Sequence, residues 1–260
     1  MSLVGSGIDL LKNLAEKVNL SQFAPFMSRL QRRSGGFDQA GRLYLDLFQE
    51  YGGLEPGGAV LDIGCGPGRM ANQMTEFIDS TGSYCGIDVV KSCVRHCNRE
   101  FGSGRSNFHF SHMDVYNGRY NKRGKLLASE YEFPYPDASF DFIILISVFT
   151  HMLEKDTSHY ISEISRLLAP SGRAFMTFFL LDEERAASIS RGESRFKYPE
   201  GTCYVQRSGQ PEFAVAYPVT AITDLLAQSG LDVLGQVNYG SWNGERSGLE
   251  FQDIVVAAKA

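Results

Sequence analysis

Three alternating glycines carry the most specific chemical signal in this chain. Ala59–Ile63 is a short apolar run that predicts a buried strand, and Gly64, Gly66 and Gly68 follow it directly. Glycine has no Cβ and readily adopts positive φ, so three of them let the backbone turn tightly and lie against a ligand. From Arg69 onward, apolar residues recur at helical spacing. This order of strand, turn and helix predicts a nucleotide-binding corner at the carboxyl end of a sheet strand.

The spacing of the glycines separates two kinds of ligand. A dinucleotide site has the pattern G-x-G-x-x-G, with a pyrophosphate at the helix N-terminus, whereas this chain has G-x-G-x-G preceded by Asp62. An acid beside the turn suits a positively charged ligand such as S-adenosylmethionine (SAM), which has a sulfonium and no phosphate. The string Val60–Gly68, VLDIGCGPG, resembles the signature (V/I)LD(I/V)GCGxG of the class I SAM-dependent methyltransferases. That resemblance implies SAM as the cofactor and S-adenosylhomocysteine (SAH) as its product.

Two further acids are candidates for binding the adenosine part of the cofactor. Asp88 ends the strand predicted at Ser83–Asp88, where an acid can accept hydrogen bonds from both ribose hydroxyls; an acid that stabilises a helix N-terminus is the alternative. The resemblance implies that Asp114, after the next strand, meets the adenine amino group, and an ordinary turn acid is the alternative. We assign Val89 and Val115, which follow these acids, to the same site.

The resemblance also implies how the methionine part of the cofactor is held. Asp62 should hold the ammonium group, directly or through water, and Gly64 and Gly66 should let the backbone contact the methionyl chain. We include Gly68, the last glycine of the turn, in the cofactor site. The resemblance covers roughly residues 54–259, including a segment LLAPSGR that is similar to the family's L-x-P-G-G turn with serine in place of its first glycine.

The residues after the strand predicted at Phe140–Ile146 are candidates for the reaction itself. The resemblance implies that Ile146 and Ser147 lie beside the sulfonium. Methyl transfer is an in-line displacement that depends on positioning and on exclusion of water, and a hydroxyl acceptor gains from a base. His151 is our catalytic candidate because histidine has a pKa suited to a base; a histidine that packs or caps a helix start is the alternative.

An aromatic segment near the end of the chain bears on the acceptor. Tyr239, Trp242 and Glu245 lie between the last two predicted strands, and glycines flank the tryptophan. This pattern suits a wall for a sugar ring, and a hairpin with an exposed aromatic side chain is the alternative. Residues 248–253 resemble the ending of bacterial methyltransferases found near glycan-assembly functions. We therefore predict transfer to a hydroxyl of a small molecule, sugar or glycoconjugate. N- or C-methylation of a small metabolite, or SAM binding without catalysis, are the alternatives.

Composition narrows the partners and the location. The chain has 260 residues and a net charge of −5, which disfavours a nucleic-acid substrate held on a basic face. No apolar run reaches the roughly 18 residues that a membrane span needs. Five cysteines without a framework spacing fit a reducing cytoplasm. Cys93 and Cys97 lack a second Cys/His pair, so we expect no metal. The sequence leaves a homodimer open.

The predicted elements alternate between strand and helix. Strands are predicted at 59–63, 83–88, 106–113, 140–146, 173–179, 231–238 and 251–258, and helices at 37–51, 90–101, 156–168 and 219–229, besides the one that begins at Arg69. This alternation predicts an α/β fold with a doubly wound, mostly parallel Rossmann-like sheet and helices on both faces. The resemblance adds that the sheet has seven strands, one of them antiparallel near the edge.

The domain organisation follows from this pattern. Residues 1–53 are predicted to form a helical accessory segment, and residues 54–260 the methyltransferase domain, with insertions at 116–135 and 182–218. Insertions this long are usually functional or mobile. Because extra segments lie next to the carboxyl ends of the strands, we expect the insertions and the N-terminal segment to cover an acceptor pocket.

Overall fold

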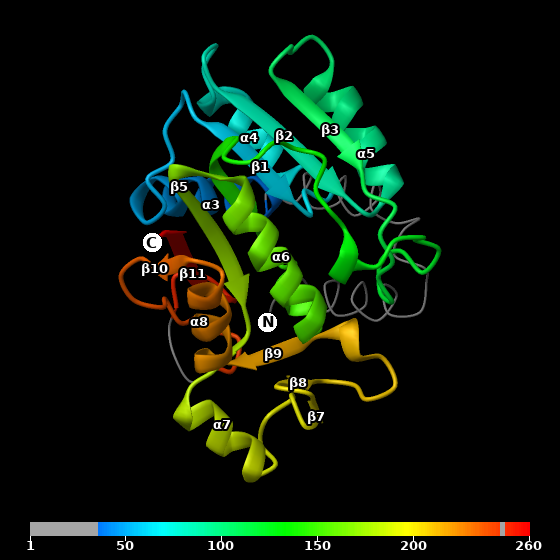
Figure 1. The fold of residues 1–260 in the computed structure, drawn as a ribbon, viewed down its shortest axis with the longest axis vertical. Coiled ribbons are helices and arrows are strands. Elements are labelled where there is room, and N and C mark those ends of the chain that lie inside the picture. Colours follow the sequence, from blue (N-terminus) through cyan, green and yellow to red (C-terminus); the bar gives the residue numbers. More distant parts are fainter. Residues whose placement is uncertain (1–35, 245–247) are drawn as a thin grey trace, which may run out of the picture.

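The computed structural model describes residues 36–244 and 248–260, and its main element is a seven-stranded sheet (Figure 1). The strands lie in the order β10-β11-β5-β4-β1-β2-β3. They are β1 (Ala59–Ile63), β2 (Ser83–Asp88), β3 (Phe108–His112), β4 (Phe140–Leu145), β5 (Leu168–Phe178), β10 (Leu231–Val233) and β11 (Asp253–Lys259). Only β11 pairs antiparallel, with β5 and with β10. The predicted doubly wound sheet with one antiparallel strand is therefore confirmed.

Helices cover both faces of the sheet and enclose two cores (Figure 1). The helices are α3 (Gly36–Glu50), α4 (Arg69–Phe77) and α5 (Lys91–Cys97) on one face, and α6 (Glu154–Leu167) and α8 (Val219–Gln228) on the other. The central strand β4 shows why two layers form. Ile143 belongs to one core and Ile144 to the other, and both are fully buried, as expected for a parallel strand covered on both sides.

Some predicted boundaries needed correction. β1 and β2 occupy the predicted residues, whereas β10 ends at Val233 instead of Asn238. Gly235 has φ +70°, which is incompatible with an extended strand, and Asn238 pairs with Ile254 only as an isolated bridge. Within the accessory segment predicted at residues 1–53, the helix predicted at 37–51 is present as α3, and residues 1–35 lie outside the described residues.

The second insertion is more ordered than its mixed sequence indicated. It contains α7 (Glu183–Ser190) and the strands β7 (Tyr198–Glu200), β8 (Cys203–Val205) and β9 (Val215–Pro218), which join β6 (Leu180–Leu181) in a small sheet of order β6-β9-β8-β7. Phe179, Phe196 and Trp242 form a separate core beneath it. The first insertion consists mainly of turns and a 3-10 helix, η3 (Ala128–Glu130).

A buried carboxylate joins the second insertion to the main sheet. Asp253 is fully buried and accepts hydrogen bonds from the backbone N–H groups of Leu180 (2.6 Å) and Gly240 (2.7 Å). The indole N–H of Trp242 (2.7 Å) and the guanidinium of Arg185 (2.8 Å) donate to the same carboxylate. Trp242 is only 7% exposed. The interpretation of Trp242 as a wall for a sugar ring is therefore wrong, and so is the alternative of an exposed aromatic.

Replacement of Asp253 by alanine should destabilise the protein strongly. It would leave Arg185, which is 1% exposed, buried without its carboxylate, and breaking a buried ion pair costs about 3–5 kcal/mol. Urea unfolding measures this free energy. The matched control is Asp232→Ala at an exposed position of β10, which should change stability by no more than about 0.5 kcal/mol. Equal stability of the two variants would show that Asp253 does not anchor the insertion.

Candidate active site

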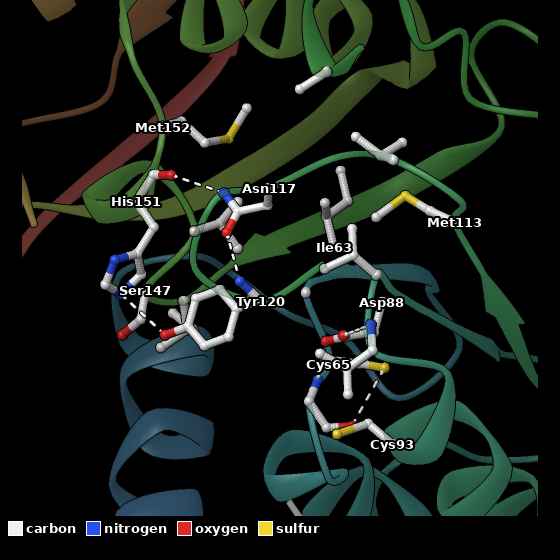
Figure 2. A pocket seen from close by; sticks show the side chains of 18 of the residues that line it. Ile63, Cys65, Asp88, Cys93, Met113, Asn117, Tyr120, Ser147, His151 and Met152 are labelled. Carbon is white, nitrogen blue, oxygen red and sulfur yellow. Dashed lines mark hydrogen bonds between the residues drawn. The ribbon is translucent and has the colours of Figure 1, made fainter. Parts of the chain in front are cut away.

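A cavity of about 440 Å³ lies at the carboxyl ends of β1, β2 and β4 (Figure 2). This is the edge of a doubly wound sheet at which ligands bind. Seven of the ten predicted cofactor residues line it, namely Gly64, Gly66, Asp88, Val89, Val115, Ile146 and Ser147. The catalytic candidate His151 lines it as well. The topology thus brings together residues that are up to 87 positions apart in the chain (151 − 64).

Asp88 fixes the glycine turn. One of its carboxylate oxygens accepts a hydrogen bond from the Gly66 N–H (2.7 Å) and the other from the Val90 N–H (2.6 Å). The carbonyl of Gly66 accepts a hydrogen bond from the Cys97 thiol (3.4 Å), so the Gly66 residue is held on both sides. Each carboxylate oxygen can accept more than one hydrogen bond, and Asp88 lines the cavity. Asp88 therefore stabilises the start of α5 and is also available to a ligand.

Gly64 shows that this turn packs closely against the segment after β4. Its φ is +79°, and a Cβ at this position would lie 2.6 Å from a methyl carbon of Val148. Any larger residue would be strained and would also push into the segment after β4. Gly68 has a different role, because it does not line the cavity. A Cβ there would lie 2.3 Å from the ring of Phe101, so Gly68 permits close packing behind the turn.

Two predicted acids lie away from the cavity wall. Asp62 is 2% exposed and accepts a hydrogen bond from the Tyr84 hydroxyl. Burial raises the pKa of Asp62 to about 7. Alternation along β1 places the side chain of Ile63, and not that of Asp62, at the cavity. Asp114 is also absent from the lining, and its carboxylate lies 3.9 Å from the ammonium of Lys125. The contacts predicted for both acids with the cofactor stay predictions.

His151 lies in a short 3-10 helix, η4 (Phe149–His151), on the side of the cavity opposite the glycine turn. Its Nδ1 is 3.0 Å from the backbone carbonyl oxygen of Glu212, and its Nε2 is 3.2 Å from the Tyr120 hydroxyl. Burial, assisted by the positive charge of Arg119, lowers the pKa of His151 to about 4. The imidazole is therefore neutral near pH 7 and can accept a proton, but it is a weaker base than an ordinary histidine.

The sequence did not reveal the residues that hold His151. Tyr120 and Asn117 line the cavity from the first insertion (Figure 2). The Asn117 amide donates to the His151 carbonyl (3.1 Å) and accepts from the Tyr120 backbone N–H (3.0 Å). Arg69, at the start of α4, also lines the cavity. The length of the first insertion was the only available signal, because single polar residues in a loop form no recognisable motif.

The two insertions contact each other beside His151. The carboxylate of Glu212, in the 3-10 helix η5 (Pro211–Phe213), accepts a hydrogen bond from the Gly118 N–H (2.5 Å). The guanidinium of Arg119 donates to the Phe213 carbonyl (3.2 Å). The first insertion lines the cavity, and the second contacts His151 through Glu212. The predicted cover over an acceptor pocket stays a prediction. Within the part of the chain that the structure describes, no three His, Cys, Asp or Glu side chains are grouped to hold a metal, and no helix could cross a membrane.

The seven-stranded sheet, the glycine turn and the acid at the end of β2 define a Rossmann-like domain of the methyltransferase type. A family model described as a methyltransferase domain matches residues 34–236, well over half of the chain. This chain belongs to the class I SAM-dependent methyltransferase family.

Comparison with known proteins gives a range of relatives. The chain is 30% identical over 149 residues to the 27-O-demethylrifamycin SV methyltransferase of Amycolatopsis mediterranei (strain S699), covering 54% of this chain and 48% of that protein. It is 30% identical over 133 residues to a tRNA N(3)-cytidine methyltransferase of Gallus gallus, covering 48% of this chain and 31% of that protein. The chain thus spans about half or less of these relatives.

Solved structures show the same fold at lower identity. The Burkholderia thailandensis 1,6-didemethyltoxoflavin-N1-methyltransferase, with 1,6-didemethyltoxoflavin and SAH bound, has a TM-score of 0.57 and 16% identity, covering 92% of this chain and 88% of that one. At this identity the likeness concerns the fold. The acceptors of the proteins compared differ, so the acceptor of this chain has to be argued from its own residues.

The raised pKa of Asp62 predicts a pH-dependent stability. Its folded-state pKa of about 7 exceeds the ordinary value of 3.8, so between these pH values the folded chain keeps a proton that the unfolded chain has lost. This group therefore lowers the free energy of unfolding as pH rises from about 4 to 7. Asparagine has no proton to lose, so Asp62→Asn should not show this decrease. The free energy of unfolding of the variant minus that of wild type should therefore be about 2–3 kcal/mol larger at pH 8 than at pH 4.5.

Urea unfolding of wild type and variant at both pH values measures this difference. Asp232→Asn, at an exposed position of the same sheet, is the control for replacing an acid by its amide. If the difference in stability between Asp62→Asn and wild type is the same at both pH values, the assignment of the raised pKa of Asp62 is wrong.

Proposed function

We propose that this protein transfers a methyl group from SAM to a hydroxyl group of a small molecule. The observation that carries the proposal is the cavity in which the glycine turn and Asp88 lie opposite a neutral His151. Bound SAM supplies a methyl group that its sulfonium has already activated. The protein has to hold the two reactants, exclude water and accept the proton of the hydroxyl.

The residues of the cavity fit the cofactor. A volume of about 440 Å³ is within the range of small-molecule sites. Asp88 would accept hydrogen bonds from the ribose hydroxyls, and Val89 and Val115 would pack against the adenine. Gly64 and Gly66 line the cavity without side chains, which suits backbone contact with the methionyl chain. Arg69, at the positive N-terminal end of α4, would attract the carboxylate of that chain.

The segment after β4 is held rigidly beside the cavity. Ser147 has φ +61°, an uncommon conformation for a residue other than glycine that is often found at functional sites. Its backbone N–H donates to the Thr177 hydroxyl (2.8 Å), and its hydroxyl donates to the Gln252 side-chain oxygen (2.9 Å). Thr177 donates to the same oxygen (2.7 Å). These bonds support the role proposed for Ile146 and Ser147, which is to lie next to the reacting sulfonium.

The acceptor side of the cavity favours a small ring compound. Tyr116 and Tyr120 line it from the first insertion, and His151 lies beside them. The burial of Trp242 removes the main support for a sugar or glycoconjugate, so we narrow the prediction to a small molecule. The rifamycin methyltransferase among the relatives acts on oxygen according to its name, which supports a hydroxyl. Three predictions from the sequence stay predictions: a nucleic-acid acceptor is disfavoured, a homodimer is left open, and the location is cytoplasmic.

Calorimetric titration tests the cofactor. SAM and SAH should bind with micromolar affinity, and NAD should not bind because the glycine spacing lacks a pyrophosphate site. Matched compounds that differ only in a hydroxyl, amine or thiol group should then be incubated with SAM labelled in its methyl group. Label should appear in the hydroxyl compound first. Transfer to the amine alone would mean that the protein is an N-methyltransferase and not an O-methyltransferase. Failure of both SAM and SAH to bind would overturn the proposal.

Asp88→Ala should weaken SAH binding at least tenfold, because hydrogen bonds to a charged group contribute about 1.5–3 kcal/mol each. The substitution also frees the glycine turn, so the ribose contact needs its own control. SAH that lacks the ribose 2′-hydroxyl should bind wild type about tenfold more weakly than SAH, whereas Asp88→Ala should bind both ligands equally. If the variant still prefers intact SAH by the wild-type factor, another residue contacts the ribose.

A further inference from the structure

We propose that Tyr120 is a catalytic residue that passes the proton of the acceptor to His151. This inference rests on the proposed function, since it concerns a hydroxyl acceptor. Tyr120 lines the cavity, and its hydroxyl is directed at the imidazole of His151 at 3.2 Å (Figure 2). The two rings meet edge to face, with 5.2 Å between their centroids and an interplanar angle of 81°.

The partners of His151 fix the direction of this hydrogen bond. Nδ1 lies 3.0 Å from the backbone carbonyl oxygen of Glu212. A carbonyl oxygen can only accept, so Nδ1 carries the proton of the neutral imidazole and Nε2 has the lone pair. The Tyr120 hydroxyl must then donate to Nε2. The Arg119 side chain also donates a hydrogen bond to the Tyr120 oxygen, which leaves one lone pair for another donor. His151 therefore reaches an acceptor hydroxyl through Tyr120.

The pair is held in place before any ligand binds. Asn117 accepts a hydrogen bond from the Tyr120 backbone and donates one to the His151 carbonyl. The guanidinium carbon of Arg119 lies 5.3 Å from the centroid of the Tyr120 ring. Glu212 fixes the other side of the imidazole through its carbonyl. Since each partner is fixed by contacts outside the pair, little reorganisation is needed at the moment of reaction.

The proton transfer balances as follows. As the acceptor oxygen forms its bond to the methyl carbon, its proton moves to the Tyr120 oxygen, and the Tyr120 proton moves to Nε2 of His151. The electron pair of the broken carbon–sulfur bond stays on sulfur. His151 ends as an imidazolium, with its Nδ1–H still on the Glu212 carbonyl. The two proton movements occur together, because burial raises the pKa of Tyr120 and a free tyrosinate would be costly.

The charges around the pair shape the pH profile. Arg119 lowers the pKa of His151, and the carboxylate of Glu212 is turned away to the Gly118 N–H. Arg119 is thus the charged group that disfavours protonation of the imidazole, because its positive charge repels the imidazolium. The rate should stay constant through neutral pH and fall only as the medium becomes acidic enough to protonate His151, whose pKa is about 4.

Nitrogen-15 NMR of the histidine rings tests the hydrogen bonds without any acceptor. In the wild-type protein bound to SAH, the resonance that His151→Gln removes should show a protonated Nδ1 and an unprotonated Nε2. Tyr120→Phe should shift the Nε2 resonance and leave Nδ1 protonated. A proton on Nε2 in wild type, or an Nε2 resonance that Tyr120→Phe does not move, would overturn the proposal.

Methyl transfer to a series of substituted phenols tests the chemical role. Tyr120→Phe should lower kcat about 100-fold for weakly acidic phenols, which is the lower end of the range for general acid–base catalysis. Its affinity for SAH should stay within about twofold of wild type. Nitrophenols that are already ionised need no base, so kcat for them should fall only a few-fold in Tyr120→Phe. Tyr131→Phe, in the same insertion but outside the cavity lining, should match wild type for all phenols.

The outcomes separate this inference from the proposed function. An equal loss for acidic and weakly acidic phenols would mean that Tyr120 only maintains the shape of the site, and the proton role would be overturned. If SAM binds but wild type methylates no hydroxyl compound, the proposed O-methylation fails. The NMR result then still decides whether the hydrogen bonds from Tyr120 through His151 to Glu212 exist.

Discussion

The structure depends on a carboxylate that water cannot reach. Asp253 begins β11 with no exposed surface, and an ionised group in that position is stable only when donors surround it. Arg185 and Trp242, together with two backbone N–H groups, supply them. These donors come from the start of the second insertion and from the segment before β11, so one residue ties both to the central sheet. The second insertion, which also carries Glu212 beside His151, is thereby joined to the sheet at its start.

The two halves of the cavity are supplied by different parts of the chain. The proposed cofactor half of the cavity depends mainly on the ends of the sheet strands and on the hydrogen bonds that Asp88 makes to Gly66 and Val90. The proposed acceptor half needs both insertions, because His151 is held by Glu212 from one and by Asn117 and Tyr120 from the other. The position of His151 therefore depends on contacts with segments that are almost 100 residues apart (212 − 117 = 95).

This division explains what the sequence could predict. β1 and β2 were predicted at their observed residues, since short buried runs closed by glycines or acids have few other interpretations. Seven of the ten residues predicted for the cofactor line the cavity, because the glycine string and the family resemblance that it carries indicated which strand ends to examine. Tyr120 and Glu212 could not be found, because their roles depend on how two irregular segments meet. Trp242 was misread for the same reason: its flanking glycines indicated exposure, whereas Asp253, 11 residues later, holds its indole inside.

The contacts that both insertions make with His151 have a consequence for the evolution of related enzymes. Two loops that only shape a binding surface can vary in length independently of each other. Here the contact of Glu212 with Gly118 and with His151 requires that the loops meet at a fixed place, so an insertion or deletion in one has to be compensated in the other. New acceptors would then be acquired by exchanging the two loops as a unit on an unchanged cofactor half.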